Sequence, residues 1–209
     1  IDRAKGTALA AALPAGQAVF EACDLRDIAA LRTSIAAVRA KLGPITILIN
    51  NAARDDRHAM ETVTPEYWDE RFATNLKHQF FAAQAVVPDM RASGGGAIVN
   101  LGSVSWVIGQ GGMPCYTTAK SAVQGLTRSL ARDLGPDNIR VNSILPGWIM
   151  TERQIAMWLT PDSEQELMTR QCLKRKLVPD DIAKVVLFFA SDDAGACTAQ
   201  GRARPPTPR

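Results

Sequence analysis

The chain has little of what binds metals or forms disulfides. Its 209 residues include two histidines, His58 and His78, and four cysteines, none of which form a CxxC pair. Such scattered thiols indicate no metal site and are typical of free cysteines in a reducing cytoplasm. We therefore expect a cytoplasmic protein that binds no metal ion.

Long apolar runs and an excess of charge are also missing. No apolar run approaches the length of a membrane span, and the opening residues, IDR, lack the apolar core of a signal peptide. The net charge is +3, and three arginines fall in the last nine residues, GRARPPTPR, which contain no acid. We therefore expect neither a membrane protein nor a nucleic-acid-binding protein.

What the chain does have is an alternation of extended and helical patterns. AVFEACDL (18–25), ITILINNAA (45–53), GAIVNLGS (96–103) and IRVNSILPG (139–147) are typical of strands. Between them, residues 28–42, residues 64–90 and the segment after Tyr116 predict helices, with Thr64 as the N-cap of the second. Strand and helix in alternation predict an α/β fold with a parallel sheet. Residues 1–200 should form a single domain.

Polar and small residues follow the expected strands, where ligands bind in such sheets. Asp24, Asn51, Ser103 and Pro146-Gly147 end four segments that are far apart in the sequence. Because the carboxyl ends of parallel strands lie at one edge, these positions should converge. Structural roles are the alternative: Asp24 could cap the next helix, the asparagines could satisfy backbone groups, and Pro146-Gly147 could be only a turn.

Tyr116, one of two tyrosines, lies four residues before Lys120 at the start of a helical pattern. Residues four apart share a helical face, so Lys120 could hold its charge near the phenol. At about 4 Å and an effective dielectric near 20 this is worth up to about 4 kcal/mol, which would lower the phenol pKa from about 10. Tyr116 could then act as a general acid or base, with Ser103 bonding the same substrate oxygen. Y-x-x-x-K also occurs by chance, as a packed tyrosine beside a solvated lysine.

Several motifs together resemble the short-chain dehydrogenase/reductase family. They are ILINNAA, FATNLKHQFF, IVNLGSVS, YTTAK and IRVNSILPGWIMT, in the order and spacing of the family, within a resemblance over about residues 1–200. It implies a Rossmann-like, three-layer, doubly wound parallel sheet. It also implies that Tyr116 is the catalytic acid/base, that Lys120 lowers its pKa and binds the nicotinamide ribose, that Ser103 orients the substrate oxygen and that Asn75 supports a proton relay. Asn75, in mid-helix, could instead face solvent.

The same resemblance implies a nicotinamide cofactor, NAD or NADP, with NAD favoured. Besides Tyr116 and Lys120, the positions implied to border it are Asp24, Leu25, Asn51, Ala52, Ala53, Pro146, Gly147, Ile149 and Thr151. Ala53 replaces the glycine usual in NNAG, a mild change.

The variable segments look like the branch that oxidises aldoses at carbon one, the xylose and galactose 1-dehydrogenases. Ser105, Gln110, Trp148 and Gln154 offer hydrogen bonds and an apolar face for a sugar, although Trp148 could simply pack a lid helix. We expect oxidation of an aldose to its lactone. A 3-ketoacyl or other ketone reductase of the family, or an inactive or nonenzymatic homologue, remains the alternative.

Two parts of the family pattern do not occur in this sequence. One is the glycine-rich TGxxxGxG turn, which binds the pyrophosphate. The other is the final strand, where GRARPPTPR, with three prolines, cannot pair in a sheet. We therefore expect the first two strands and the last strand to be absent and residues 201–209 to be a disordered tail. A homodimer through the long helices is possible, but the family tetramer is not expected.

The missing glycine-rich turn generates a prediction about cofactor affinity. Residues 1–209 alone should bind NAD(H) at least about a hundredfold more weakly than a complete homologue, a loss of about 2.7 kcal/mol. The reason is that the backbone N–H groups of the turn normally hold the pyrophosphate. Calorimetric titration of the chain measures this affinity, and micromolar binding would contradict the prediction.

Overall fold

The computed structural model describes residues 2–201 of the chain. Its strands are β1 (Ile47–Asn50), β2 (Gly96–Leu101) and β3 (Ile139–Ile144). Its helices are α1 (Arg3–Ala11), α2 (Ile28–Leu42), α3 (Pro65–Phe72), α4 (His78–Ala92), α5 (Pro114–Leu134), α6 (Glu152–Trp158), α7 (Pro161–Arg170) and α8 (Pro179–Ala190). Short 3-10 turns lie at Met60–Thr62, Gly135–Asp137 and Asp192–Ala194.

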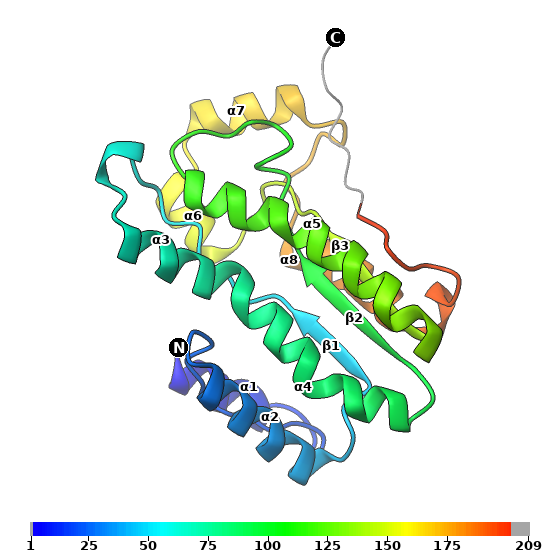
Figure 1. Ribbon diagram of the computed structural model, residues 1–209. Coiled ribbons are helices and arrows are strands. Elements are labelled where there is room, and N and C mark those ends of the chain that lie inside the picture. The colour runs from blue at the N-terminus through cyan, green and yellow to red at the C-terminus, as the bar shows by residue number, and fades with distance from the viewer. Residues whose placement is uncertain (1, 202–209) are drawn as a thin grey trace.

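The described strands form one parallel sheet in the order β1-β2-β3, with helices on both faces (Figure 1). On one face, residues of α4 and α5 such as Val86, Met90 and Leu134 pack with Ile98 and Val141 in one buried cluster. On the other face α8 packs Ile182, Val186 and Phe189 against Val99, Leu101 and Ile144. The structure therefore confirms the expected α/β, parallel, three-layer arrangement.

The prediction of a strand at residues 18–25 is wrong. The segment has no regular secondary structure, because no described strand lies beside it to pair with its backbone groups. Instead it contacts α1 through Phe20, whose ring lies directly against Gly6. The sequence pattern did not predict the helix α1. The outer edge of β1 is correspondingly uncovered: Ile47 is 48 % exposed and Ile49 is 36 % exposed.

The described residues after α8 return to the sheet beside β3. Ala199 N donates to Val141 O, Ser143 N donates to Gln200 O, both at 2.8 Å, and Ser143 and Gly201 form an isolated parallel bridge. Gly201 is thus held by the sheet, which corrects the expectation that a disordered tail begins there. The rest of that predicted tail, residues 202–209, lies outside the described residues.

The long helix predicted for residues 64–90 is interrupted by a π-helical turn, Ala73–Lys77. Thr64 caps its start as predicted, by accepting from Tyr67 N at 3.2 Å. At the interruption, Asn75 Nδ2 donates to Arg71 O at 2.9 Å, the carbonyl that a regular helix would reserve for the Asn75 backbone N–H. This competition gives a physical reason for the local widening of the helix.

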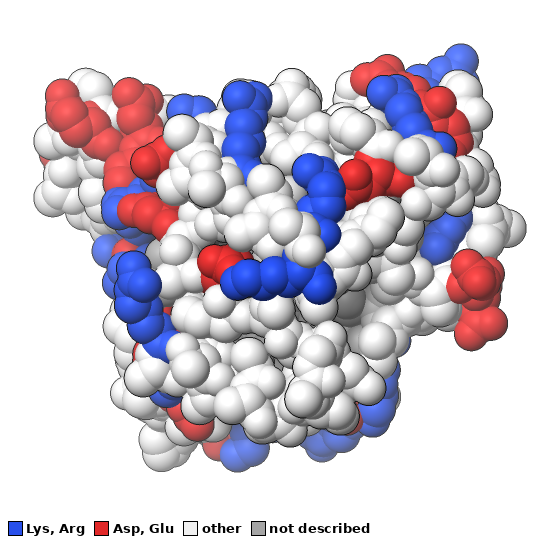
Figure 2. All heavy atoms as spheres, turned by 90° about the horizontal axis from the view of Figure 1, so that it is seen from below, with Lys and Arg blue, Asp and Glu red and all other residues white. Residues whose placement is uncertain are grey.

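Charged side chains of both signs lie side by side on the face of the molecule seen in Figure 2, separated by uncharged areas. Two arginines of α2 make polar contacts with side chains of α4. Arg39 Nε lies 2.6 Å from Asp89 Oδ2, and Arg32 Nη2 donates to Gln84 Oε1 at 2.7 Å. These contacts add little stability individually, because the charged groups remain partly accessible to water.

A buried row of polar side chains joins β1, β2 and α5. Asn50 Nδ2 donates to Asn100 Oδ1 at 2.9 Å, and Asn100 Nδ2 donates to Thr127 Oγ1 at 3.1 Å. All three side chains are at most 5 % exposed. The row confirms that these residues satisfy one another between elements, and it fixes α5 against the carboxyl half of the sheet.

Thr127→Val should lower the free energy of unfolding by about 1–2 kcal/mol, because it leaves the buried Asn100 amide without its acceptor. The matched control is Thr118→Val, on the exposed face of the same helix. Chemical denaturation of both variants measures the difference. Equal losses would show that the buried bond is not what matters.

Candidate active site

The loops that follow β2 and β3 are bonded to each other at the carboxyl edge of the sheet. Gly102 N donates to Ile144 O at 2.8 Å, and Val104 N donates to Pro146 O at 3.1 Å. These bonds bring the loop of Ser103 next to the loop of Gly147. The convergence predicted from the strand ends is therefore present for these two loops.

Tyr116 and Lys120 lie in the first two turns of α5, on the face toward this edge. Tyr116 is half-buried, whereas Lys120 is only 1 % exposed. Lys120 Nζ donates to Leu101 O at 2.6 Å and lies 5.8 Å from the centre of the Tyr116 ring. The helix spacing thus brings the ammonium and the phenol together, as expected from the sequence.

The pKa of Tyr116 nevertheless changes in the direction opposite to the prediction. Burial raises it, the Ser103 hydroxyl opposes that rise by hydrogen bonding, and the Asp55 carboxylate adds to it. Burial also lowers the pKa of Lys120 to about 8. The expected lowering of the Tyr116 pKa is therefore wrong for this structure, because burial of the phenol outweighs the Ser103 hydrogen bond and the Arg57 charge, which favour the phenolate.

Asn75 is fully buried in the π-helical turn and does not face solvent. Its Oδ1 accepts from Arg54 N at 2.8 Å, so the side chain holds the loop that follows β1. In addition, Ser103 Oγ accepts from Ser105 N at 3.1 Å, which fixes the loop that follows β2. The structure therefore gives both residues positions at the site edge.

Several residues predicted to border the cofactor are exposed or have open space around them. Asn51, Ala52 and Ala53, predicted for the cofactor groove, are exposed, and a Cβ placed on Gly147, predicted to flank the nicotinamide, would meet nothing within 4 Å. These groups leave room for a flat ring and its ribose. The residues present therefore fit the nicotinamide half of the cofactor.

Other predicted cofactor positions have structural contacts of their own. Thr151 caps α6 by accepting from Gln154 N at 3.2 Å, and Ile149 forms an isolated bridge with Leu177. Asp24 is bound by Arg26, which holds the pKa of that carboxyl at about 2, and Leu25 directly precedes this arginine. Asp27, not Asp24, caps α2.

Two predicted substrate residues are bonded to each other rather than standing free. Trp148 Nε1 donates to Gln154 Oε1 at 2.8 Å, and Gln154 Nε2 donates to Asp55 Oδ2 at 2.7 Å. Asp55 also contacts Arg153, so the loop after β1 is connected to α6. Asp55 and Arg153 were missed by sequence reasoning, although the charged run RDDRH after a strand end was a usable signal.

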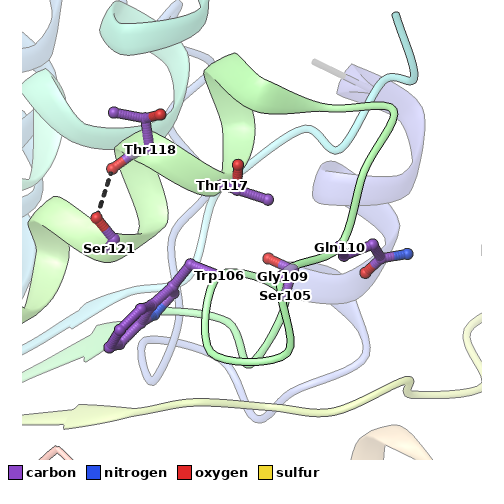
Figure 3. Close-up of a pocket in the computed structure, with 7 residues that line it drawn as sticks. All are labelled: Ser105, Trp106, Gly109, Gln110, Thr117, Thr118 and Ser121. Atoms are coloured by element: carbon purple, nitrogen blue, oxygen red, sulfur yellow. Dashed lines mark hydrogen bonds between the residues drawn. The ribbon is translucent and has the colours of Figure 1, made fainter.

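Ser105 and Gln110 line a pocket of about 260 Å³ between the loop after β2 and α5 (Figure 3). Trp106 and Gln110 extend from the loop in opposite directions, while Thr117 and Ser121 belong to the helix. With its amide oxygen turned toward Arg57, Gln110 accepts from Nη1 at 2.9 Å.

The position of this pocket relative to Tyr116 limits what it can do. Neither Tyr116 nor Lys120 lines it, but Thr117, the residue that follows Tyr116, does. Ser105 is 4 % exposed, and its hydroxyl has no hydrogen-bond partner among the described residues. The pocket therefore offers an unused polar group next to the reactive edge.

The sequence as a whole matches one family model over residues 1–202, described as enoyl-(acyl carrier protein) reductase, a model of the short-chain dehydrogenase/reductases. The chain belongs to the short-chain dehydrogenase/reductase family. It is thus an oxidoreductase of a family whose dehydrogenases use NAD(P). Membership confirms the resemblance that the motifs indicated.

Two relatives of this short-chain dehydrogenase/reductase share about half of its residues. A Rhizobium meliloti (strain 1021) protein named "Probable galactose dehydrogenase GalD" is 53 % identical over 87 % of this chain and 71 % of its own length. D-xylose 1-dehydrogenase of Caulobacter vibrioides is 48 % identical over 86 % of this chain and 71 % of its own.

Solved structures agree with this placement. A structure from Sinorhizobium meliloti 1021, titled as a "putative short-chain alcohol dehydrogenase", superimposes with a TM-score of 0.81 at 34 % identity, covering 86 % of this chain and 71 % of that one.

In residues 2–201, no helix is long and apolar enough to span a membrane. The same residues contain no group of three or more His, Cys, Asp or Glu that could hold a metal ion.

Burial of Lys120 leads to a prediction about stability and pH. The fall of its pKa from 10.5 to about 8 corresponds to up to about 3 kcal/mol of destabilisation in the protonated state. Below pH 8 both the folded and the unfolded chain hold this proton, so the cost is complete. Between pH 8 and 10.5 the unfolded chain binds more protons, and stability rises as the cost is relieved.

Lys120→Met should therefore stabilise the fold at pH 7, by less than this amount because the bond to Leu101 O is lost. The advantage over the parent chain should shrink as the pH rises from about 8 to 10.5. Denaturant unfolding of both proteins across this range measures it. A difference that does not change with pH would contradict the assignment of a protonated, buried Lys120.

Proposed function

We propose that this protein oxidises an aldose at carbon one, with a nicotinamide cofactor, to give the lactone. The observation that carries the proposal is the arrangement of Tyr116, Lys120, Ser103 and Asn75 around one sheet edge in a chain about half identical to a named galactose dehydrogenase and a named D-xylose 1-dehydrogenase. NAD is favoured over NADP. We further propose that the protein is cytoplasmic and forms a homodimer.

The polar groups beside the reactive edge support a sugar as substrate. Ser105 offers a hydroxyl without a partner among the described residues, and Gln110 offers an amide next to Arg57. Trp148 contributes an indole whose N–H is already bonded to Gln154. Hydroxyl and amide groups beside an aromatic face are the combination that a sugar, with its hydroxyls and its apolar C–H face, requires.

The mechanism follows from the groups around Tyr116. An oxidised nicotinamide bound here would supply the acceptor for the hydride that leaves carbon one of the sugar, together with a positive charge. The Tyr116 oxygen accepts the proton of the C1 hydroxyl, while Ser103 hydrogen-bonds that same oxygen and orients it. Lys120, held by Leu101 O, is placed to bind the ribose, and Asn75 holds the loop that covers the site.

The raised pKa of Tyr116 bears on the direction of the reaction. With the pKa raised by burial, Tyr116 holds its proton at neutral pH in the present structure. Oxidation requires the phenolate, and a nearby positive charge favours that form. In this proposal, binding of the oxidised cofactor should therefore also favour the phenolate form of Tyr116, which is the form that accepts the proton.

Ketone reduction is the alternative within the family. The protonated Tyr116 is the form that donates a proton to a carbonyl, which favours this alternative in the present structure. The two functions are distinguished by supplying aldoses with oxidised cofactor and 3-ketoacyl compounds with reduced cofactor. Turnover of the second pair alone would replace the proposed function.

Tyr116→Phe should reduce turnover to below a few per cent of the parent while leaving cofactor binding largely intact, because only the proton-transferring hydroxyl is removed. The assay uses a form of the protein that carries the glycine-rich turn of the family, hereafter the turn-containing form. Aldose oxidation is followed by nicotinamide absorbance and cofactor binding by nicotinamide fluorescence. Retention of substantial activity would refute the role of Tyr116.

A further inference from the structure

The charged run Arg54–His58 begins four residues after the end of β1 and is not explained by the family motifs. Two of its members, Asp55 and Asp56, are adjacent and both contact Arg153 of α6. Their other partners differ. Asp56 Oδ2 lies 2.5 Å from Nη1 of Arg71, a buried arginine of α3, whereas Asp55 accepts from Gln154. The two carboxylates therefore connect the loop to different parts of the molecule.

Asp55 lies at one end of a chain of hydrogen bonds that terminates at an aromatic ring. Its Oδ2 accepts from Gln154 Nε2 at 2.7 Å, and Gln154 Oε1 accepts from Trp148 Nε1 at 2.8 Å. Gln154 uses both ends of its amide in this chain, and the indole uses its only N–H. The orientation of the Trp148 ring is thus determined through Gln154 by a carboxylate on another segment.

The segments that carry Asp55 and Trp148 both border the candidate site. The residue before Asp55, Arg54, donates its N–H to Asn75 Oδ1 at 2.8 Å, and Pro146, two residues before Trp148, accepts from Val104 N at 3.1 Å. The side chain of Asp55 is 18 % exposed. Burial alone would raise the pKa of Asp55, but hydrogen bonds from Gln154 and Arg153 outweigh burial and lower it. Asp55 is therefore ionised at neutral pH and accepts from both donors.

We propose that Asp55 is a positioning residue for substrate specificity: through Gln154 it holds the indole of Trp148 as a fixed wall against which a polyhydroxyl substrate binds. This inference rests on the proposed function, because the substrate it describes is the aldose. A wall that is already oriented spares the substrate the cost of ordering it on binding. Loss of Asp55 should thus weaken substrate binding more than it slows the chemical step.

Three variants of the turn-containing form test the chain of bonds. Asp55→Ala and Gln154→Leu should each raise KM for the aldose by about tenfold, and the double variant should raise it no further, because both remove one shared pathway. The kcat and the KM for NAD should change by less than about threefold. Asp56→Ala is the matched control, because it removes a neighbouring carboxylate that contacts Arg153 but not Gln154.

A second measurement follows Trp148 without any substrate. Acrylamide quenching is measured for each protein and for the same protein with Trp148→Phe. Subtracting the second fluorescence signal from the first removes the contribution of the other three tryptophans and leaves that of Trp148. Quenching should at least roughly double in Asp55→Ala and Gln154→Leu and stay unchanged in Asp56→Ala, since a released indole becomes more accessible. Thermal unfolding of each variant checks that it is folded.

The outcomes separate this inference from the proposed function. If no aldose is oxidised but quenching changes as described, the proposed function and the aldose specificity fail, whereas the orientation of the Trp148 indole by Asp55 through Gln154 stands. If aldose oxidation occurs and Asp55→Ala affects KM and quenching no more than Asp56→Ala does, the positioning role is overturned. Additive effects in the double variant would overturn it as well.

Discussion

The parallel register of the three strands is the constraint on which the site depends. In that register Asn50 of β1 lies opposite Asn100 of β2, and their amides bond to each other and to Thr127 of α5. A buried amide without a partner costs about 1–3 kcal/mol, so this row strongly disfavours any slippage of the strands or of the helix. With α5 fixed in this way, Lys120 reaches Leu101 O at the carboxyl end of β2. The catalytic edge is therefore a consequence of sheet register.

The site is built around cations that the fold buries. Arg71 is 7 % exposed and is held between Glu70 and Asp56, and the hydrogen bonds that it donates to these carboxylates outweigh burial and raise its pKa. Lys120 has no such carboxylate partner among the described residues, and burial lowers its pKa to about 8. Pairing offsets much of the desolvation cost of a buried charge, whereas an unpaired buried charge bears that cost in full and is typical of functional sites. The contrast is consistent with a structural Arg71 and a functional Lys120.

The residues proposed to recognise the substrate lie in segments outside the sheet. Here the loop after β1 and α6 are bonded through Asp55, Arg153 and Gln154, and the indole of Trp148 is bonded to the same group. These residues follow strand ends, where side chains are free of packing constraints, so they can differ between relatives without disturbing the core. Relatives named for galactose and for D-xylose can thus share about half of the residues of this chain.

The sequence by itself determined the layers, the parallel sheet and the pairing of Tyr116 with Lys120. Apolar runs flanked by helical periodicity specify buried parallel strands, and Tyr116 and Lys120 are neighbours because helix geometry brings residues four apart together. Only the tertiary structure decided the rest. Residues 18–25 form no strand because strand formation needs a neighbour that no local pattern supplies. The pKa of Tyr116 depends on its burial and on nearby charges, which the spacing along the chain does not reveal. The bonds of Asp55 to Gln154 and Arg153 join residues about a hundred positions apart, which the spacing does not reveal either.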